Sequence, residues 1–172
     1  MGRTETWARR IGFAVGLAAA AALVLAGRFP PGDGTLGAHL VLAAHPQGEL
    51  GVRPSGPFLQ APHLRAGDET RGSVEVVNQT GVALAVRVRG LPSSSQLDRL
   101  LRLEIDAGAD RIFLGTLDEL RAWSPAALRL EPGESRTLSV RAWLPATVGG
   151  GYEGRVEQVG LEFDPAPAEG AP

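Results

Sequence analysis

Residues 82–89 read Val-Ala-Leu-Ala-Val-Arg-Val-Arg, and this stretch decides the fold class. The larger aliphatic side chains occupy every second position, and Arg87 and Arg89 lie between them. Successive side chains of an extended strand point to opposite faces, so the stretch has one apolar and one polar face. It predicts a strand that packs one face against a core, as strands of antiparallel sheets commonly do.

Similar alternation recurs along most of the chain. We expect strands at 36–44, 73–76, 82–88, 101–105, 111–114, 127–130, 137–144 and 152–163. Turn residues at 78–81 and 107–110 predict two hairpins, and the Pro-Gly pair at 132–133 predicts a type II turn with positive φ at Gly133. Val156 is out of phase with Val159, Leu161 and Phe163, which predicts a bulge, and 54–62 resembles a loop.

Two short helical turns interrupt the strands. Ser95 with Asp98, and Thr116 with Glu119, have the spacing of capping boxes. Seven or eight short strands with one apolar face each predict two antiparallel sheets packed face to face. The fold class is therefore all-β: a two-sheet β-sandwich, jelly-roll or immunoglobulin-like, with one or two short helices.

The N-terminal segment has the pattern of an export signal. Residues 1–10 contain three Arg and one Glu, and residues 11–26 contain no charge. A basic start followed by an apolar helix is typical of a secretory signal peptide, with an uncleaved membrane anchor as the alternative. We therefore expect an exported, extracellular or cell-surface protein, anchored through 11–26 if the segment is retained.

These patterns divide the chain into four parts. Residues 1–26 form the signal or anchor, 27–35 a Pro/Gly linker, 36–164 the sandwich, and 165–172 a Pro/Ala-rich disordered tail. The absence of cysteine excludes disulfides, thiolate metal sites and a cysteine nucleophile. A net charge of −2 gives no reason to expect nucleic acid as a partner.

Residues with catalytic or metal-binding chemistry are few. The three histidines, His39, His45 and His63, form no zinc motif, and we interpret them as solvent-facing. Asp106 and Asp110 lack the further oxygen ligands of an EF-hand and are interpreted as a hairpin turn. The sequence therefore predicts no catalytic residue, no metal site and no cofactor.

Three other features have a structural interpretation beside a functional one. Ser93, Ser94 and Ser95 have no accompanying His and are assigned to a loop and cap. Residues 78–80 match a glycosylation sequon, which we consider accidental because the arginine-only, alanine-rich composition is typical of a GC-rich bacterium. Outward-facing Arg and Glu residues predict cross-strand pairs, with a surface that binds an acidic wall polymer as the alternative. The aromatic residues at 123, 143 and 152 predict packing within the fold, with a carbohydrate-binding platform as the alternative.

Several motifs together resemble a known family. They are Gly-Asp at 67–68, Val-x-Asn at 76–78, Gly-x-Leu-x-x-Leu at 115–120 and Leu-x-Pro-Gly-Glu-Ser at 130–135. Their order is similar to that of the TasA/camelysin-like exported proteins. The resemblance implies a jelly-roll-like sandwich and, for some members, biofilm-matrix fibres in which an N-terminal strand of one copy completes the next. Some members of that family are classed as peptidases. This chain departs from the family pattern after the cleavage site, where the usual aromatic-rich segment is replaced by the aliphatic segment 36–44.

The segment 36–44 is the candidate strand donor. Its apolar face comprises Leu36, Ala38, Leu40, Leu42 and Ala44. A strand that follows a flexible linker can pair with its own sheet or with the open edge of a neighbour, so self-association is one expectation. Three functions remain open: a non-enzymatic matrix or structural subunit, an envelope-associated module that binds wall polymer, carbohydrate or a protein partner, and a metallopeptidase-like enzyme. We expect the first.

Overall fold

The computed structural model describes residues 37–91 and 96–168, and these form a two-sheet β-sandwich. Its strands are β1 (Ala38–Pro46), β2 (Leu50–Arg53), β3 (Gly56–Leu64), β4 (Glu69–Asn78), β5 (Leu84–Leu91), β6 (Arg102–Ala107), β7 (Asp110–Thr116), β8 (Leu128–Leu130), β9 (Ser135–Trp143) and β10 (Val156–Pro167). Two short 3₁₀ helices, η1 (Gln96–Arg99) and η2 (Glu119–Arg121), flank the β6–β7 hairpin. The predicted fold class is confirmed, whereas the expected signal segment and linker lie outside the described residues.

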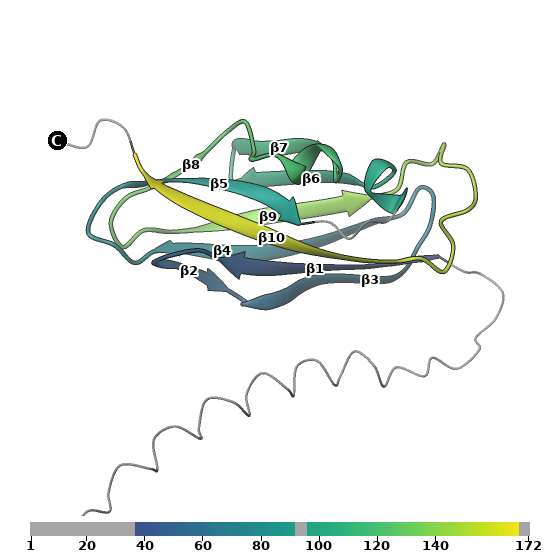
Figure 1. Ribbon diagram of the computed structural model, residues 1–172, viewed down its shortest axis with the longest axis horizontal. Coiled ribbons are helices and arrows are strands. Elements are labelled where there is room, and N and C mark those ends of the chain that lie inside the picture. The colour runs from purple at the N-terminus through teal and green to yellow at the C-terminus, as the bar shows by residue number, and fades with distance from the viewer. Residues whose placement is uncertain (1–36, 92–95, 169–172) are drawn as a thin grey trace, which may run out of the picture. The chain divides into compact units, whose positions relative to one another are not determined.

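The two sheets have five strands each. The first sheet has the order β3-β1-β10-β5-β8, and the second has the order β2-β4-β9-β6-β7. Figure 1 shows β10 running along the sandwich beside β1 and β5. All pairs are antiparallel except β1 with β10, which corrects the expectation of wholly antiparallel sheets.

The period-two pattern explains the core. Inward positions of both sheets contribute one apolar cluster, in which Leu40, Val86 and Leu130 are fully buried. Leu97, Leu117 and Leu120, in or beside the two 3₁₀ helices, belong to the same cluster. Burial of each leucine side chain stabilises the fold by roughly 2 kcal/mol.

The predicted β6–β7 hairpin and the second capping box are confirmed. Ile105 lies opposite Phe113, and the turn contains Gly108 with a φ of 68°. The Glu119 amide donates to Thr116 Oγ1 at 3.2 Å, and the Thr116 amide donates to a Glu119 carboxylate oxygen at 2.6 Å. Those bonds fix the chain between β7 and η2.

The hairpin predicted across 78–81 is wrong, because β4 and β5 belong to different sheets. The buried Asn78 explains the difference. Its amide donates to the carbonyls of Val82, Leu130 and Glu131, and its oxygen accepts from Thr80. A side chain that satisfies these groups lets the chain cross between the layers instead of folding back.

The turn at 131–134 also connects the two sheets, since β8 pairs with β5 and β9 with β4 and β6. Gly133 has a φ of 73°, as the Pro-Gly pair predicts. The Gly133 amide donates to the Asn78 carbonyl at 3.0 Å. The two crossings between the sheets are therefore hydrogen-bonded to each other.

Two segments expected to be irregular are strands, and both contain proline. Residues 56–64 form β3, which is an edge strand of the first sheet, where a missing N–H is tolerated. The tail expected from residue 165 starts later than that, because β10 continues to Pro167 and the Ala168 amide donates to the Ala83 carbonyl. Pairing of β10 with β1 ends at Phe163, so its prolines lie where that side of the strand is unpaired.

The bulge predicted at Val156 is also wrong. The register of β10 against β1 is continuous from Val156 to Phe163. Val156 points outward and is 56% exposed, whereas Glu157 occupies the inward position next to it and is fully buried. Val156 is out of phase with the later apolar residues because the inward position beside it is occupied by the buried acid Glu157.

Candidate functional site

The predicted strand-donor face belongs to β1, which is the second strand of the first sheet and lies between β3 and β10. Ala38, Leu40 and Leu42 are fully buried, and Ala44 is 2% exposed. Leu36, the fifth residue of the predicted face, lies outside the described residues. Of the two pairings that we considered for this segment, the structure has the one with its own sheet, where β1 pairs with β3 on one side and with β10 on the other.

The surroundings of β1 form a slot between two strands. Leu40 lies opposite Ala61 of β3 on one side and Glu157 of β10 on the other. The His39 amide donates to the Arg155 carbonyl at 2.8 Å at the entrance of the slot. The strand is thus held by two hydrogen-bonded ladders and a buried aliphatic face.

The connections of β1 are short on its C-terminal side. Only Gln47, Gly48 and Glu49 separate it from β2, which belongs to the other sheet. Gly48 has a φ of 60°, a conformation that favours glycine. This three-residue segment is the hinge about which β1 would have to turn in order to leave its own sheet.

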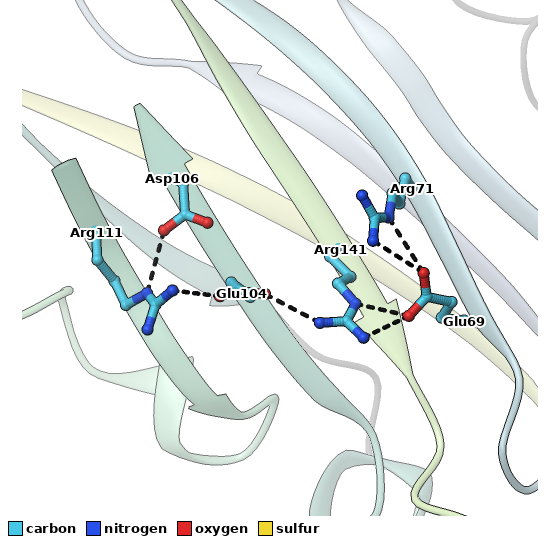
Figure 2. Close-up of polar contacts among 6 residues, drawn as sticks. All are labelled: Glu69, Arg71, Glu104, Asp106, Arg111 and Arg141. Carbon is cyan, nitrogen blue, oxygen red and sulfur yellow. Dashed lines mark hydrogen bonds and ion pairs between the residues drawn. The ribbon is translucent and has the colours of Figure 1, made fainter. Parts of the chain in front are cut away.

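A ladder of ion pairs covers the outer face of the second sheet. Arg141 of β9 binds Glu69 of β4 and Glu104 of β6, and Arg111 of β7 binds Glu104 at 2.5 Å. Arg71 and Asp106 extend the ladder at its two ends, as Figure 2 shows. Three Arg and three acids balance in charge, which confirms the predicted cross-strand pairing on this face.

The first sheet carries a smaller polar network on its outer face. Arg89 donates to Glu162 at 2.6 Å, and the Gln47 side chain donates to the same carboxylate at 3.3 Å. The Arg89 guanidinium lies 4.5 Å from the ring centre of Trp123. On the second sheet Arg141 lies 4.8 Å from the ring centre of Trp143. Both indoles therefore stack on arginines of their own domain.

Tyr152 is separate from these indoles. It is 7% exposed, and its hydroxyl accepts a hydrogen bond from the Ala66 amide at 2.9 Å. The structure therefore does not bring Tyr152, Trp123 and Trp143 together as a platform.

The remaining predicted positions are scattered or structural. His39, His45 and His63 lie on β1 and β3, and the described part of the chain contains no group of three or more His, Asp or Glu residues placed to hold a metal ion. Asp106 pairs with Arg111 beside the β6–β7 turn. Ser93, Ser94 and Ser95 lie outside the described residues. The Asn78 amide nitrogen makes three hydrogen bonds inside the fold, so the sequon is not available to a glycan in the folded domain.

A buried acidic pair was missed by the sequence interpretation. Asp98 of η1 is 1% exposed, and Glu157 of β10 is fully buried. Arg121 of η2 donates to Asp98 at 2.5 Å. Burial and the neighbouring Glu157 raise the pKa of Asp98 to about 6, and Arg121 opposes the shift. The alternation of 157, 159, 161 and 163 was the signal that could have placed Glu157 inside.

Comparisons with known proteins add little. No protein-family model and no curated protein matches the chain. A solved structure, titled "Structure of the N-terminal domain of PorA", is similar at 11% identity and a TM-score of 0.31, covering 76% of this chain and 90% of that one. Among residues 37–91 and 96–168, no helix is long and apolar enough to cross a membrane.

Proposed function

We propose that this chain is an exported, non-enzymatic structural protein of the cell surface or extracellular matrix, and that copies assemble by exchanging β1. The N-terminal signal or anchor pattern and the resemblance to TasA/camelysin-like proteins support export and assembly. The position of β1 between two strands of its sheet is the observation on which the exchange depends.

The slot that holds β1 would accept the same strand from another copy. Its contacts are the ladders to β3 and β10 and the burial of Ala38, Leu40, Leu42 and Ala44. A second copy's β1 would make all of these contacts, so exchange would leave the folded energy nearly unchanged. The β1 of each copy would then fill the next copy's slot, and such a head-to-tail contact propagates into a filament when the rotation does not close.

The short hinge favours exchange over self-insertion. A short connection that must turn sharply is strained, and straightening it releases that strain. Residues 47–49 must carry the chain from the first sheet to the second within three positions. On the other side of β1 the sequence predicts a Pro/Gly-rich linker at 27–35, which would follow a displaced strand.

Lengthening the hinge tests this proposal. Four residues, Gly-Ser-Gly-Ser, are inserted after Gly48 of the full-length protein, and the same four are inserted after Gly108 as a matched control in the β6–β7 turn. Sedimentation velocity should show oligomers of the 18.0 kDa chain for the wild type and the Gly108 insertion, and monomers for the Gly48 insertion. A wild type that stays monomeric at every concentration would contradict the proposal.

A second candidate is an envelope-associated module that binds wall polymer or carbohydrate. The stacked pairs Arg89–Trp123 and Arg141–Trp143 favour it, because half-buried indoles on the outer faces can contact sugar rings. Retention of the protein on purified envelope material, with loss of retention in Trp123→Ala or Trp143→Ala, would support this candidate. Equal retention of wild type and variants would contradict it.

A further inference from the structure

Two acids from distant parts of the sequence meet inside the sandwich. Asp98 belongs to η1, and Glu157 is the second residue of β10. Their exposed fractions are 1% and 0%. A buried ionised carboxylate is costly unless it is paired and hydrogen-bonded, so two such groups together need an explanation.

The two carboxyl groups are close enough to hydrogen-bond with each other. Two neighbouring carboxyl groups that are both ionised repel each other strongly, and a hydrogen bond between them needs one proton. Asp98 Oδ1 is buried without a hydrogen-bond partner in the part of the chain that the structure describes. A proton on the pair therefore relieves both the repulsion and part of the desolvation.

The charged groups acting on Asp98 come from two elements. Glu157 approaches from β10, and Arg121 approaches from η2 with its Nη2 at 2.5 Å from Asp98 Oδ2. Asp118 also binds Arg121, at 2.8 Å from its Nε. On the β1 side, Leu40 is the neighbour of Glu157. Among the residues that the structure describes, Arg121 already supplies positive charge to Asp98, which favours a proton over a metal ion as the further partner.

We propose that Asp98 and Glu157 share one proton and act as a pH-dependent latch, which ties η1 to the beginning of β10 and so holds β10 against β1. The latch is independent of whether β1 is exchanged between copies. Glu157 lies beside Leu40, so loosening the latch would weaken the entrance of the β1 slot.

The sign of the pH effect follows from the raised pKa of Asp98. The folded pKa of about 6 exceeds the ordinary value of 3.8, so the folded state binds the proton more tightly than the unfolded chain. The stabilisation is complete below the ordinary value and is lost as the pH rises through the folded value. The latch is therefore closed in mild acid and opens towards alkaline pH.

The test compares unfolding by urea at about pH 5 and about pH 8. The proteins are the full-length wild type, Asp98→Asn, Glu157→Gln and the exposed control Glu49→Gln. The wild type and Glu49→Gln should have lower midpoints at the higher pH, whereas the two amide variants should lose most of this dependence. A wild-type midpoint that does not fall, or a Glu157→Gln dependence equal to that of Glu49→Gln, would overturn the latch.

Two measurements on the wild type do not depend on the variants folding. Amide hydrogen exchange, corrected for its intrinsic pH dependence, should show about tenfold less protection at Leu40 and Val159 at the higher pH. Carbon NMR of the carboxyl groups should show Asp98 titrating near pH 6. Unchanged protection, or titration of Asp98 at or below its ordinary value of 3.8, would also refute the proposal.

Discussion

The guanidinium of Arg121 lies 2.5 Å from the carboxylate of Asp98, and the two side chains differ sharply in exposure, at 50% and 1%. The half-exposed Arg121 therefore places its positive charge next to an acid that is buried inside the fold. The same guanidinium binds Asp118 in its own turn, which fixes its position over the buried pair. This contact joins η2 to η1, and Glu157 of β10 acts on the same Asp98 carboxylate.

Replacing Arg121 should therefore destabilise the domain in a pH-dependent way. Arg121→Met leaves Asp98 without its counter-charge, and we expect a loss of about 2 kcal/mol at pH 8, because a hydrogen bond to a charged group is removed. The loss should be smaller at pH 5, where the carboxyl pair holds its proton. Arg99→Met, an exposed arginine on η1, is the matched control and should be nearly neutral. Equal losses at the two pH values, measured by urea unfolding, would contradict this account.

Asn78 should be among the least replaceable polar residues. Asn78→Ala removes the donor for three carbonyls and the acceptor for the Thr80 amide. We expect a loss of about 3 kcal/mol, since several buried groups lose their partner. The exposed neighbour Gln79→Ala should change the free energy of unfolding by less than about 0.5 kcal/mol. Thermal unfolding of the two variants measures the difference, and similar values would argue against Asn78 as the organiser of the two crossings.

Gly72 should not accept a side chain, because β3 and β4 approach closely there. A Cβ at Gly72 would lie 2.8 Å from the Phe58 carbonyl oxygen and 2.9 Å from Leu59 Cβ. Gly72→Ala should destabilise by about 2 kcal/mol, as overpacking against backbone does. At Gly81 an added Cβ meets nothing within 4 Å, so Gly81→Ala is the control. A Gly72→Ala variant as stable as Gly81→Ala would mean that the two strands lie further apart.

The ladder of ion pairs on the second sheet should contribute little to the free energy of unfolding. Its contribution should be lost in acid, whereas that of Asp98 is lost at higher pH. Hydrogen bonds from Arg141 and Arg71 hold the pKa of Glu69 below its ordinary value of 4.5. This stabilisation is present above that value and is lost as the pH falls below it. Arg141→Ala should therefore lower the melting temperature slightly at neutral pH and less in high salt, because exposed ion pairs are screened. A large loss that salt does not reduce would contradict a solvent-screened ladder.

The sequence predicted the layers better than their connections. Alternation depends only on which face of each strand is buried, so the core strands β5, β6 and β9 are found from local pattern. Which strand pairs with which depends on contacts such as those of Asn78, whose carbonyl partners lie up to 53 residues away. Local turn residues gave no indication that 78–81 and 131–134 connect the two sheets.

The candidate sites differ in how far the sequence alone could predict them. The apolar face of β1 follows from its own alternation, but its place between β3 and β10 required the parallel pairing of the first and last strands. Proline at 57, 62, 165 and 167 suggested irregular chain, although strand edges tolerate it. Glu157 was passed over because an acid on an inward position contradicts the usual pattern, and its partner Asp98 lies 59 residues earlier (157 − 98).

The most direct test of the central claim is a disulfide trap between β1 and β10. Val41 lies opposite Gln158 on the outer face, and the chain has no cysteine of its own. Val41→Cys with Gln158→Cys is oxidised in the full-length protein, beside Ser73→Cys with Ser139→Cys, which pairs β4 with β9 within one copy. On non-reducing gels we expect a ladder of covalent oligomers for the first pair and monomers for the second. Monomers alone for both pairs would show that β1 stays in its own sheet and would contradict assembly by strand exchange.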